Sequence, residues 1–262
     1  MNEFTAYAAS FAIGISLGLI GAGGSILTIP VFVYVLKKDP LSSGVYSMFV
    51  VGVSAMAGSI QSMINKVVDL KTAIMFGAPS IVGVFVARKF IFPSIPAEFS
   101  IIGSLTVSKE ILFMLCFAAL MFLAAIKMLR PLHVEEPSAA KPSVVPLLLR
   151  GLLVGIITGL LGIGGGFLIV PALYLWARLP VKQAIGTALL VIATNSLFSF
   201  LTSYSSTNIE WTLLTRFSIG AVIGIAIGTS LSKKCSGDQL KKVFAFFILA
   251  ISVYIGYKQL FF

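Results

Sequence analysis

The residues with the clearest chemical potential are glycines, because they lie in a stretch that occurs twice. The first copy covers residues 14–30, and the second covers residues 155–171, 141 positions later. Nine of the 17 aligned positions are identical, and six of those nine are glycine or proline. Since glycine costs a helix about 1 kcal/mol and proline about 3 kcal/mol, we predict a broken helix at both copies. A half-helix that starts at such a break directs free N–H groups and its positive dipole end at a ligand, which favours an anion.

The predicted backbone site consists of the densest glycine positions of each copy and one serine. These are Gly21, Gly23, Gly24, Ser25, Gly162, Gly164, Gly165 and Gly166. A nucleotide loop is excluded, because Ile26 and Phe167 replace the third glycine of GxGxxG and no GK[ST] follows. Two other interpretations stay open, since such glycines could act as hinges or let helices pack closely. Close packing is the interpretation that we favour for the GxxxG spacing of Gly220, Gly224 and Gly228.

Polar side chains on later helices could complete the site. Thr187, Thr194 and Asn195 follow the second glycine stretch, and Ser47 aligns with Thr187 in the first half. Two hydroxyls at matching positions could donate to one ligand, although Ser and Thr in helices commonly bond their own backbone. Arg216 is the candidate charge partner of an anion, and snorkelling to the membrane surface is the alternative for it.

The chain offers little material for other chemistry. No Asp or Glu lies deep in an apolar segment, which argues against a carboxylate proton relay and against acid–base catalysis. The single histidine, His133, and the two cysteines, Cys116 and Cys235, form no metal-binding or redox pattern. We therefore predict no enzyme activity, no metal and no cofactor. The net charge of +10 comes from Lys and Arg in short connections, as is usual beside membrane spans, so we expect no nucleic-acid partner.

The composition indicates a membrane protein. Hydrophobic residues make up 58% of the chain, charged residues only 11%, and the mean hydropathy is +1.05, whereas soluble chains contain about 25% charged residues. Some eight uncharged stretches approach the length of about 20 residues that a spanning helix needs. We predict an all-α polytopic protein that lies in a lipid bilayer.

Two homologous repeats organise the chain, residues 1–130 and 146–262, with a polar linker at 131–145. Each repeat would hold a glycine-broken first segment and three transmembrane helices, and we expect residues 92–108 to be a connecting loop at the interface. The repeats are parallel if the first segment crosses the membrane and inverted if it is a re-entrant hairpin. Without Arg216, Lys and Arg divide 11 to 7 in the parallel arrangement and 12 to 6 in the inverted one, which does not decide between them. We favour the inverted arrangement, because a segment dense in glycine and closed by proline suits two half-helices.

The paired motifs resemble the TauE/SafE family, the sulfite exporter or toluene-sulfonate uptake permeases. The resemblance lies in residues 18–24 with Pro30, residues 159–166 with Pro171, and the run Ala-Ile-Gly-Thr-Ala-Leu at 184–189. The first copy departs from the pattern at Ser25, which aligns with Gly166. The resemblance covers nearly the whole chain. It implies duplicated membrane modules that carry small sulfur-containing or organic anions across the cytoplasmic membrane.

We therefore interpret the chain as a permease or exporter of a small anion, and the resemblance implies sulfite, a sulfonate or sulfoacetate. The anion would bind at the membrane midplane between the two broken helices, and the repeats would rock around it. Without a buried acid, facilitated or potential-driven export is expected rather than tight proton symport. A passive anion channel and a membrane assembly partner without flux are the alternatives. The sequence leaves open the anion, the direction, the coupling ion, the orientation and whether the protein forms a homodimer.

Overall fold

The computed structural model describes residues 3–21, 23–91, 94–95, 98–102, 105–129, 144–161, 166–204 and 209–261. The first half of the chain holds α1 (Glu3–Ile20), α2 (Gly23–Pro30), η1 (Val31–Val35), α3 (Pro40–Ile64), α4 (Leu70–Val86), η2 (Ala87–Ile91), β1 (Glu98–Ile102), β2 (Leu105–Ser108) and α6 (Lys109–Leu129). The second half holds α7 (Val144–Leu161), α8 (Gly166–Trp176), α9 (Val181–Ser203), α10 (Trp211–Lys234) and α11 (Gly237–Phe261). The segments η1 and η2 are π-helical turns that continue α2 and α4.

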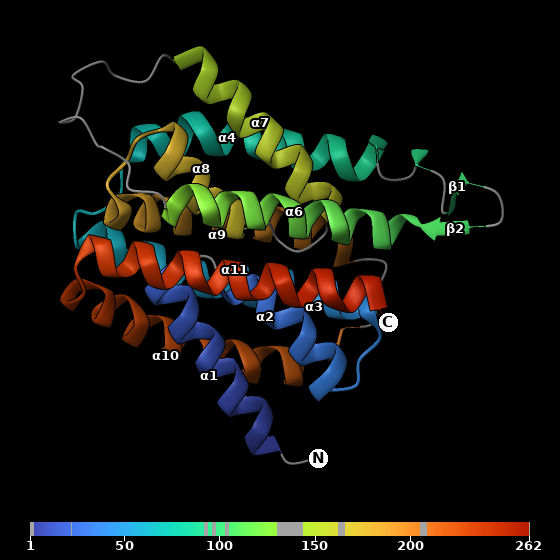
Figure 1. The fold of residues 1–262 in the computed structure, drawn as a ribbon. Helices are drawn as coiled ribbons and strands as arrows, with labels where there is room; N and C mark the ends of the chain where they lie inside the picture. Colours follow the sequence, from blue (N-terminus) through green and yellow to red (C-terminus); the bar gives the residue numbers. More distant parts are fainter. Residues whose placement is uncertain are drawn as a thin grey trace.

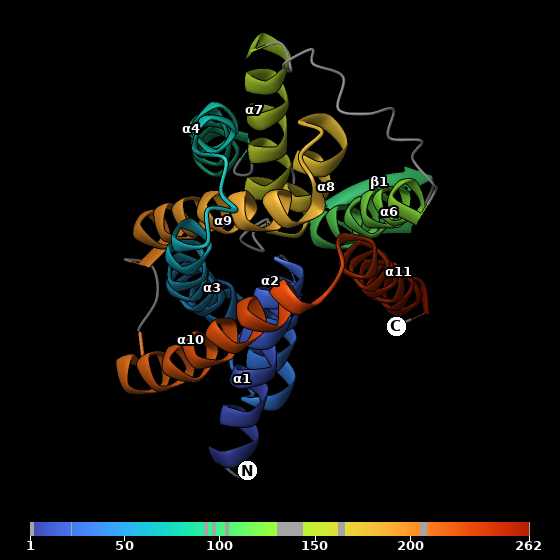
Figure 2. The same cartoon turned by 90° about the vertical axis from the view of Figure 1, so that its left-hand side faces the viewer.

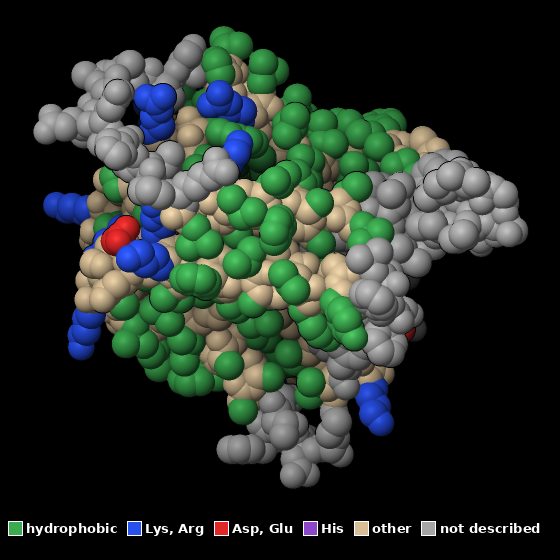
Figure 3. All heavy atoms as spheres, viewed as in Figure 1, with side chains coloured by type: hydrophobic (Ala, Val, Ile, Leu, Met, Phe, Trp, Pro, Cys, Tyr) green, Lys and Arg blue, Asp and Glu red, His purple; other side chains and the backbone are tan. Residues whose placement is uncertain are grey.

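Five of the described helices are long and apolar enough to cross a membrane, namely α3, α4 with η2, α9, α10 and α11. Their outward faces carry large apolar side chains such as Ile74, Val82 and Ile219, each more than half exposed. Figure 3 shows one such face, where hydrophobic side chains cover the middle and Lys and Arg lie towards the edges. This distribution suits a chain surrounded by lipid, and it confirms the prediction of a multi-pass membrane protein.

The first helix of each half packs against the third long helix of the other half. Thus α1 lies along α10, and α7 lies along α4 (Figure 1). Glycines make both contacts close, since a Cβ at Gly14 would overlap the carbonyl of Ala221 and a Cβ at Gly155 would overlap that of Ser80. The GxxxG spacing therefore serves close helix packing here, as we predicted for Gly224 and its neighbours.

We call α1–α10 and α4–α7 the exchanged pairs, because each joins helices of different halves. In both pairs the two helices run parallel. Along α1, Gly14 faces Ala221 and Gly18 faces Ile225, so both helices advance in the same direction. Along α7, Gly155 faces Ser80, and Gly159 faces Val84. Two bundles result, one of α1, α2, α3 and α10 and the other of α4, α7, α8 and α9 (Figure 2). We call them the α10 bundle and the α4 bundle after the helix that each receives from the other half.

The two bundles meet where α3 packs on α9. A Cβ at Gly52 would lie 2.8 Å from the Leu197 side chain, whereas a Cβ at Gly58 would lie 3.2 Å from that of Leu189. Because the numbers rise along one helix as they fall along the other, α3 and α9 run antiparallel. The remaining pair, α6 and α11, lies beside both bundles (Figure 2), and in Figure 1 α6 begins at the side where α11 ends, so this pair is antiparallel too.

A short hairpin occupies part of the segment that we expected to be loop. Strand β1 pairs antiparallel with β2, with Glu98 opposite Ser108 and Phe99 opposite Val107. The sequence here is rich in Ile, Val, Thr and Phe, which favour strands over turns. The expectation of a loop at 92–108 is therefore wrong for these two strands, and the fold is helical with one added hairpin.

Candidate functional site

The first glycine stretch interrupts its helix, as predicted. Helix α1 ends at Ile20, Gly21 has a φ of 76°, and α2 starts at Gly23. A positive φ is the left-handed region, which glycine adopts without the penalty that a Cβ brings. The Gly21 N–H donates to the carbonyl of Leu17 at 2.7 Å, which closes the last turn of α1.

The second glycine stretch lies mostly outside the described residues. Gly162, Gly164 and Gly165 fall there, and Gly166 is the first residue of α8. On the first side, Gly24 is buried in α2, and the side chain of Ser25 is outside the described part. The two half-helices that follow the glycine stretches, α2 and α8, are therefore both in place.

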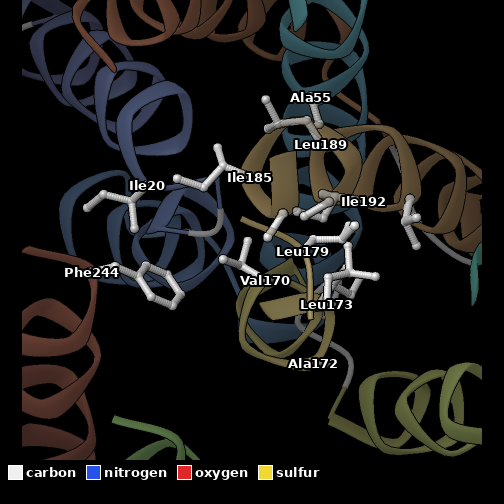
Figure 4. Close-up of a cluster of buried hydrophobic side chains, with 14 of the residues drawn as sticks. Ile20, Ala55, Val170, Ala172, Leu173, Leu179, Ile185, Leu189, Ile192 and Phe244 are labelled. Carbon is white, nitrogen blue, oxygen red and sulfur yellow. The ribbon is translucent and has the colours of Figure 1, made fainter. Parts of the chain in front are cut away.

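The two broken segments meet in one apolar core. Helix α2 contacts α8, and a Cβ at Gly21 would lie 2.9 Å from Ile185 and 3.2 Å from Val170. Figure 4 shows Ile20, Val170 and Ile185 converging between the helices. A backbone turn in such apolar surroundings leaves N–H groups that need partners, because lipid and hydrocarbon side chains supply none.

Each broken segment returns towards the end of the molecule where it starts. Arg150, near the start of α7, donates from Nη1 to the carbonyl of Trp176 at the end of α8, at 3.3 Å. On the other side, α1 runs parallel to α10, and α10 begins beside the connection that follows η1, where Lys38 pairs with Glu210. In each broken segment, the start of the first helix and the end of the second therefore lie near one another.

The predicted polar side chains go to different places. Asn195 is buried in α9, and its Nδ2 donates to Ser80 Oγ in α4 at 2.7 Å, while its Oδ1 has no partner. Thr187 Oγ1 accepts from the backbone N–H of Asp69 at 3.0 Å. Thr194 donates to carbonyls of its own helix, which is the alternative that the sequence left open.

Ser47 and Thr187 do not come together. Ser47 is buried near the start of α3 and Thr187 near the start of α9, and these helices are antiparallel. Gly186 packs against Ser62, so Thr187 lies some 14 residues along α3 from Ser47, which is about 20 Å at 1.5 Å per residue. The hydroxyl of Ser47 lacks a partner, as does that of Ser54 two turns along the same face. One ligand cannot bridge positions 47 and 187.

Arg216 is exposed on α10 and faces away from the core. Arg88 in η2, one of the Lys and Arg that the sequence places in short connections, is only partly exposed. Its Nη1 donates to Ser203 Oγ at 2.7 Å, and its Nε is buried without a partner. The hydrogen bond to the end of α9 distinguishes Arg88 from the exposed Lys89, and the sequence carried no signal for it.

A small open pocket, with a cavity volume of about 40 Å³, lies at the end of the molecule where α9 starts. Its lining combines apolar residues with polar and basic ones, namely Val67, Ile185 and Leu240 with Ser62, Asn65, Lys182, Thr229, Ser232 and Lys233. Lys182 Nζ donates to the carbonyl of Lys233 at 3.1 Å. Ile185 belongs both to this pocket and to the contact with Gly21, so the pocket lies next to the tip of the α1–α2 hairpin. Among the described residues, no group of His, Cys, Asp or Glu could hold a metal ion.

Paired discontinuous helices inside a multi-pass apolar chain are a feature of membrane transporters. Comparison with known proteins agrees. Residues 6–255 match the family of the sulfite exporter TauE/SafE, and the chain belongs to this family.

Curated relatives have similar length and broad names. A "Probable membrane transporter protein" of Xylella fastidiosa is 30% identical, over 94% of this chain and 92% of that protein. The "Probable membrane transporter protein YunE" of Bacillus subtilis is 24% identical, over 96% of this chain and 99% of its own. No solved structure is significantly similar to the chain.

Proposed function

We propose that the chain is a permease for a small sulfur-containing anion such as sulfite, a sulfonate or sulfoacetate. The observation that carries the proposal is the meeting of two glycine-broken segments, α1–α2 and α7–α8, in one buried core. Membership of a family described as sulfite exporters supports the choice of anion. A transporter role also accounts for the predicted lack of enzyme activity.

The two halves are inverted repeats in this proposal. Equivalent helices related by an axis along the membrane normal would run parallel, whereas an axis in the membrane plane makes them antiparallel. The antiparallel packing of α3 on α9 and of α6 on α11 supports the second case. The return of each broken segment to its starting end supports a re-entrant hairpin followed by three spans.

The charge distribution supports one orientation. Without Arg216, ten Lys and Arg of the described helices and connections lie around the end where α3 leads into α4, and six lie at the other end. The ten are Lys66, Lys71, Lys127, Arg150, Arg178, Lys182, Lys233, Lys234, Lys241 and Lys242; the six are Lys37, Lys38, Arg88, Lys89, Lys109 and Lys258. By the positive-inside rule the first end is cytoplasmic. The pocket beside Lys182 then opens to the cytoplasm, and both termini of the chain lie outside.

The anion binds at the hairpin tips. The starts of α2 and α8 contribute free N–H groups and the positive ends of two helix dipoles, which suit an oxyanion without a metal or a buried lysine. Gly21, Gly23, Gly24 and Ser25 form one side, and the stretch 162–166 forms the other. The unbonded hydroxyls of Ser47 and Ser54 are further donors along the α3 face.

Transport follows from movement of the two bundles about the α3–α9 contact. The exchanged pairs α1–α10 and α4–α7 are held by backbone contacts at glycine, so each bundle moves as a body. The inside-negative membrane potential favours exit of an anion by about 2.3 kcal/mol per charge per 100 mV. Export therefore needs no buried carboxylate.

The test is flux through the purified protein in liposomes. Sulfite, thiosulfate, sulfoacetate and acetate are compared as internal anions, with protein-free liposomes as the control. We expect saturable efflux that prefers the sulfur anions, accelerates under an outside-positive potential and shows counter-flow. Non-saturable conductance would indicate a channel, and a lack of flux for every anion would contradict the proposal.

A further inference from the structure

Arg88 lies in η2, at the end of the α4–η2 helix, and its side chain is only partly exposed. Its Nη1 donates to Ser203 Oγ at 2.7 Å, and its Nε is buried without a partner. No ion pair joins Arg88 to a carboxylate in the described part of the chain. A guanidinium has five N–H donors, so most of its capacity remains open. A cation held partly out of water without a counter-charge is costly, and in a membrane protein such a residue generally serves function.

A structural role accounts for part of this placement. Ser203 is the last residue of α9, and a cation near the end of a helix stabilises its negative dipole end. That role needs only one face of the guanidinium. It explains neither the buried Nε nor the π-helical turn at 87–91, a distortion that often marks functional sites.

The repeat provides a comparison for this position. Arg88 aligns with Thr229 at the offset of 141, and Thr229 Oγ1 donates to Gln61 Oε1 at 2.6 Å across the α10–α3 contact. The equivalent contact in the α10 bundle is therefore neutral and complete. Only the α4 bundle has a cation here, so packing of the fold does not demand one.

We propose that Arg88 binds an oxyanion at the outer mouth of the pathway, and that this oxyanion is the transported sulfur anion. The inference rests on the proposed function. The guanidinium would hold two oxygens of a sulfite or sulfonate group through Nε and its second Nη nitrogen, while Nη1 stays on Ser203. Planar two-point binding of this kind is specific to Arg, and Lys cannot reproduce it.

The test compares Arg88→Gln and Arg88→Lys with Lys89→Gln, a matched control that removes the adjacent, exposed charge. In sulfite flux measurements we expect KM to rise about tenfold to a hundredfold for both Arg88 variants, because charged hydrogen bonds are lost. Lys89→Gln should change KM less than twofold. Ser203→Ala removes the hydrogen bond but leaves the cation, so it should keep most of the affinity.

Thermal unfolding distinguishes anion binding by Arg88 from a purely structural role at the end of α9. Sulfite should raise the melting temperature of the wild type and not that of Arg88→Gln, whose own melting temperature should stay near that of the wild type. A variant that loses stability but keeps KM would mean that Arg88 only holds α9. If phosphatidylglycerol rather than sulfite stabilises the wild type through Arg88, the ligand is a lipid headgroup and the substrate proposal is overturned. If the wild type transports no anion at all, the proposed function is wrong. Binding of sulfite by Arg88 is then tested only by whether sulfite stabilises the wild type and not Arg88→Gln.

Discussion

The α4 bundle and the α10 bundle have the same helix arrangement but different polar chemistry. In the α4 bundle, Asn195 bonds to Ser80 between α9 and α4. The aligned positions in the α10 bundle are Ala55 and Ala221, both fully buried. A buried amide is expensive unless it is bonded, whereas alanine needs no partner. The duplicated halves therefore share their packing while only one of them carries this polar contact.

The connections between helices show the opposite pattern, where different residues preserve one interaction. The backbone N–H of Asp69 donates to the hydroxyl of Thr187, and the aligned N–H of Glu210 donates to the hydroxyl of Tyr46, at 2.9 Å. In each case, a hydroxyl of one repeat satisfies a turn of the other. The hydrogen bonds that join the two halves at these turns are therefore equivalent in both bundles. The two bundles differ in their polar side chains at Asn195 and Arg88.

The strongest disruption should come from the glycines of the exchanged pairs. Gly14→Leu and Gly155→Leu each force a side chain into a facing carbonyl, so we expect a loss of about 3 kcal/mol or more, or no folded protein. The two variants should behave alike, which fluorescence-detected size exclusion and thermal unfolding in detergent can measure. Gly256→Leu is the control, because nothing lies within 4 Å of its Cβ position. If only one of the two leucine variants folded normally, the two bundles would not be equivalent in their packing.

The Asn195–Ser80 contact should matter in one bundle only. Ser80→Ala leaves the amide of Asn195 without its acceptor, at a cost of about 1–3 kcal/mol. The double variant Asn195→Ala with Ser80→Ala should lose less than the sum of the single variants, because it leaves no unpaired group. The matched changes in the other bundle, Ala55→Gly and Ala221→Gly, touch no polar pair and should add independently. Additive losses at Asn195 and Ser80 in thermal unfolding would show that their hydrogen bond contributes little.

The two turn contacts should be equivalent in energy. Thr187→Val and Tyr46→Phe each remove one hydroxyl acceptor, and we expect about 1 kcal/mol for each. Unfolding temperatures of the two variants should fall within about a degree or two of one another. A large loss at Thr187 alone, together with a raised KM for sulfite, would instead make Thr187 a substrate ligand.

The smallest effect is expected at the surface. Lys38→Gln removes the ion pair with Glu210, in which the carboxylate side is largely exposed, and such pairs are worth about 1 kcal/mol or less. The melting temperature should change little, and the change should vanish in high salt. A salt-independent loss would mean that this pair fixes the return of the α1–α2 hairpin more firmly than its exposure indicates.

The sequence predicted local structure correctly where a residue type permits only one backbone conformation or one kind of packing. Gly21 needs a left-handed turn, and the helix breaks there. Apolar stretches of sufficient length became long helices, and the GxxxG series became a close contact. The β1–β2 hairpin was missed because we expected all of residues 92–108 to be a connecting loop, although several of them favour strands.

Predictions that depended on distant contacts succeeded less well. Ser47 and Thr187 match in the repeat, but antiparallel packing of α3 on α9 puts them at opposite ends. Arg216 was the candidate charge partner and Arg88 was one of many Lys and Arg in short connections, yet Arg216 is exposed and Arg88 is partly buried. Sequence spacing gives the position of a residue along its own helix, and it does not say which helix lies opposite.

The most direct test of the account is sulfite flux through Gly21→Ala, measured against Gly256→Ala. A Cβ at position 21 is strained by the positive φ and approaches Ile185, so it alters the tip of the first hairpin without removing any polar side chain. We predict that Gly21→Ala stays folded, with a melting temperature within several degrees of the wild type, and that it loses most sulfite flux while Gly256→Ala keeps it. Normal saturable flux through a folded Gly21→Ala protein would contradict the claim that the broken helices line the anion pathway.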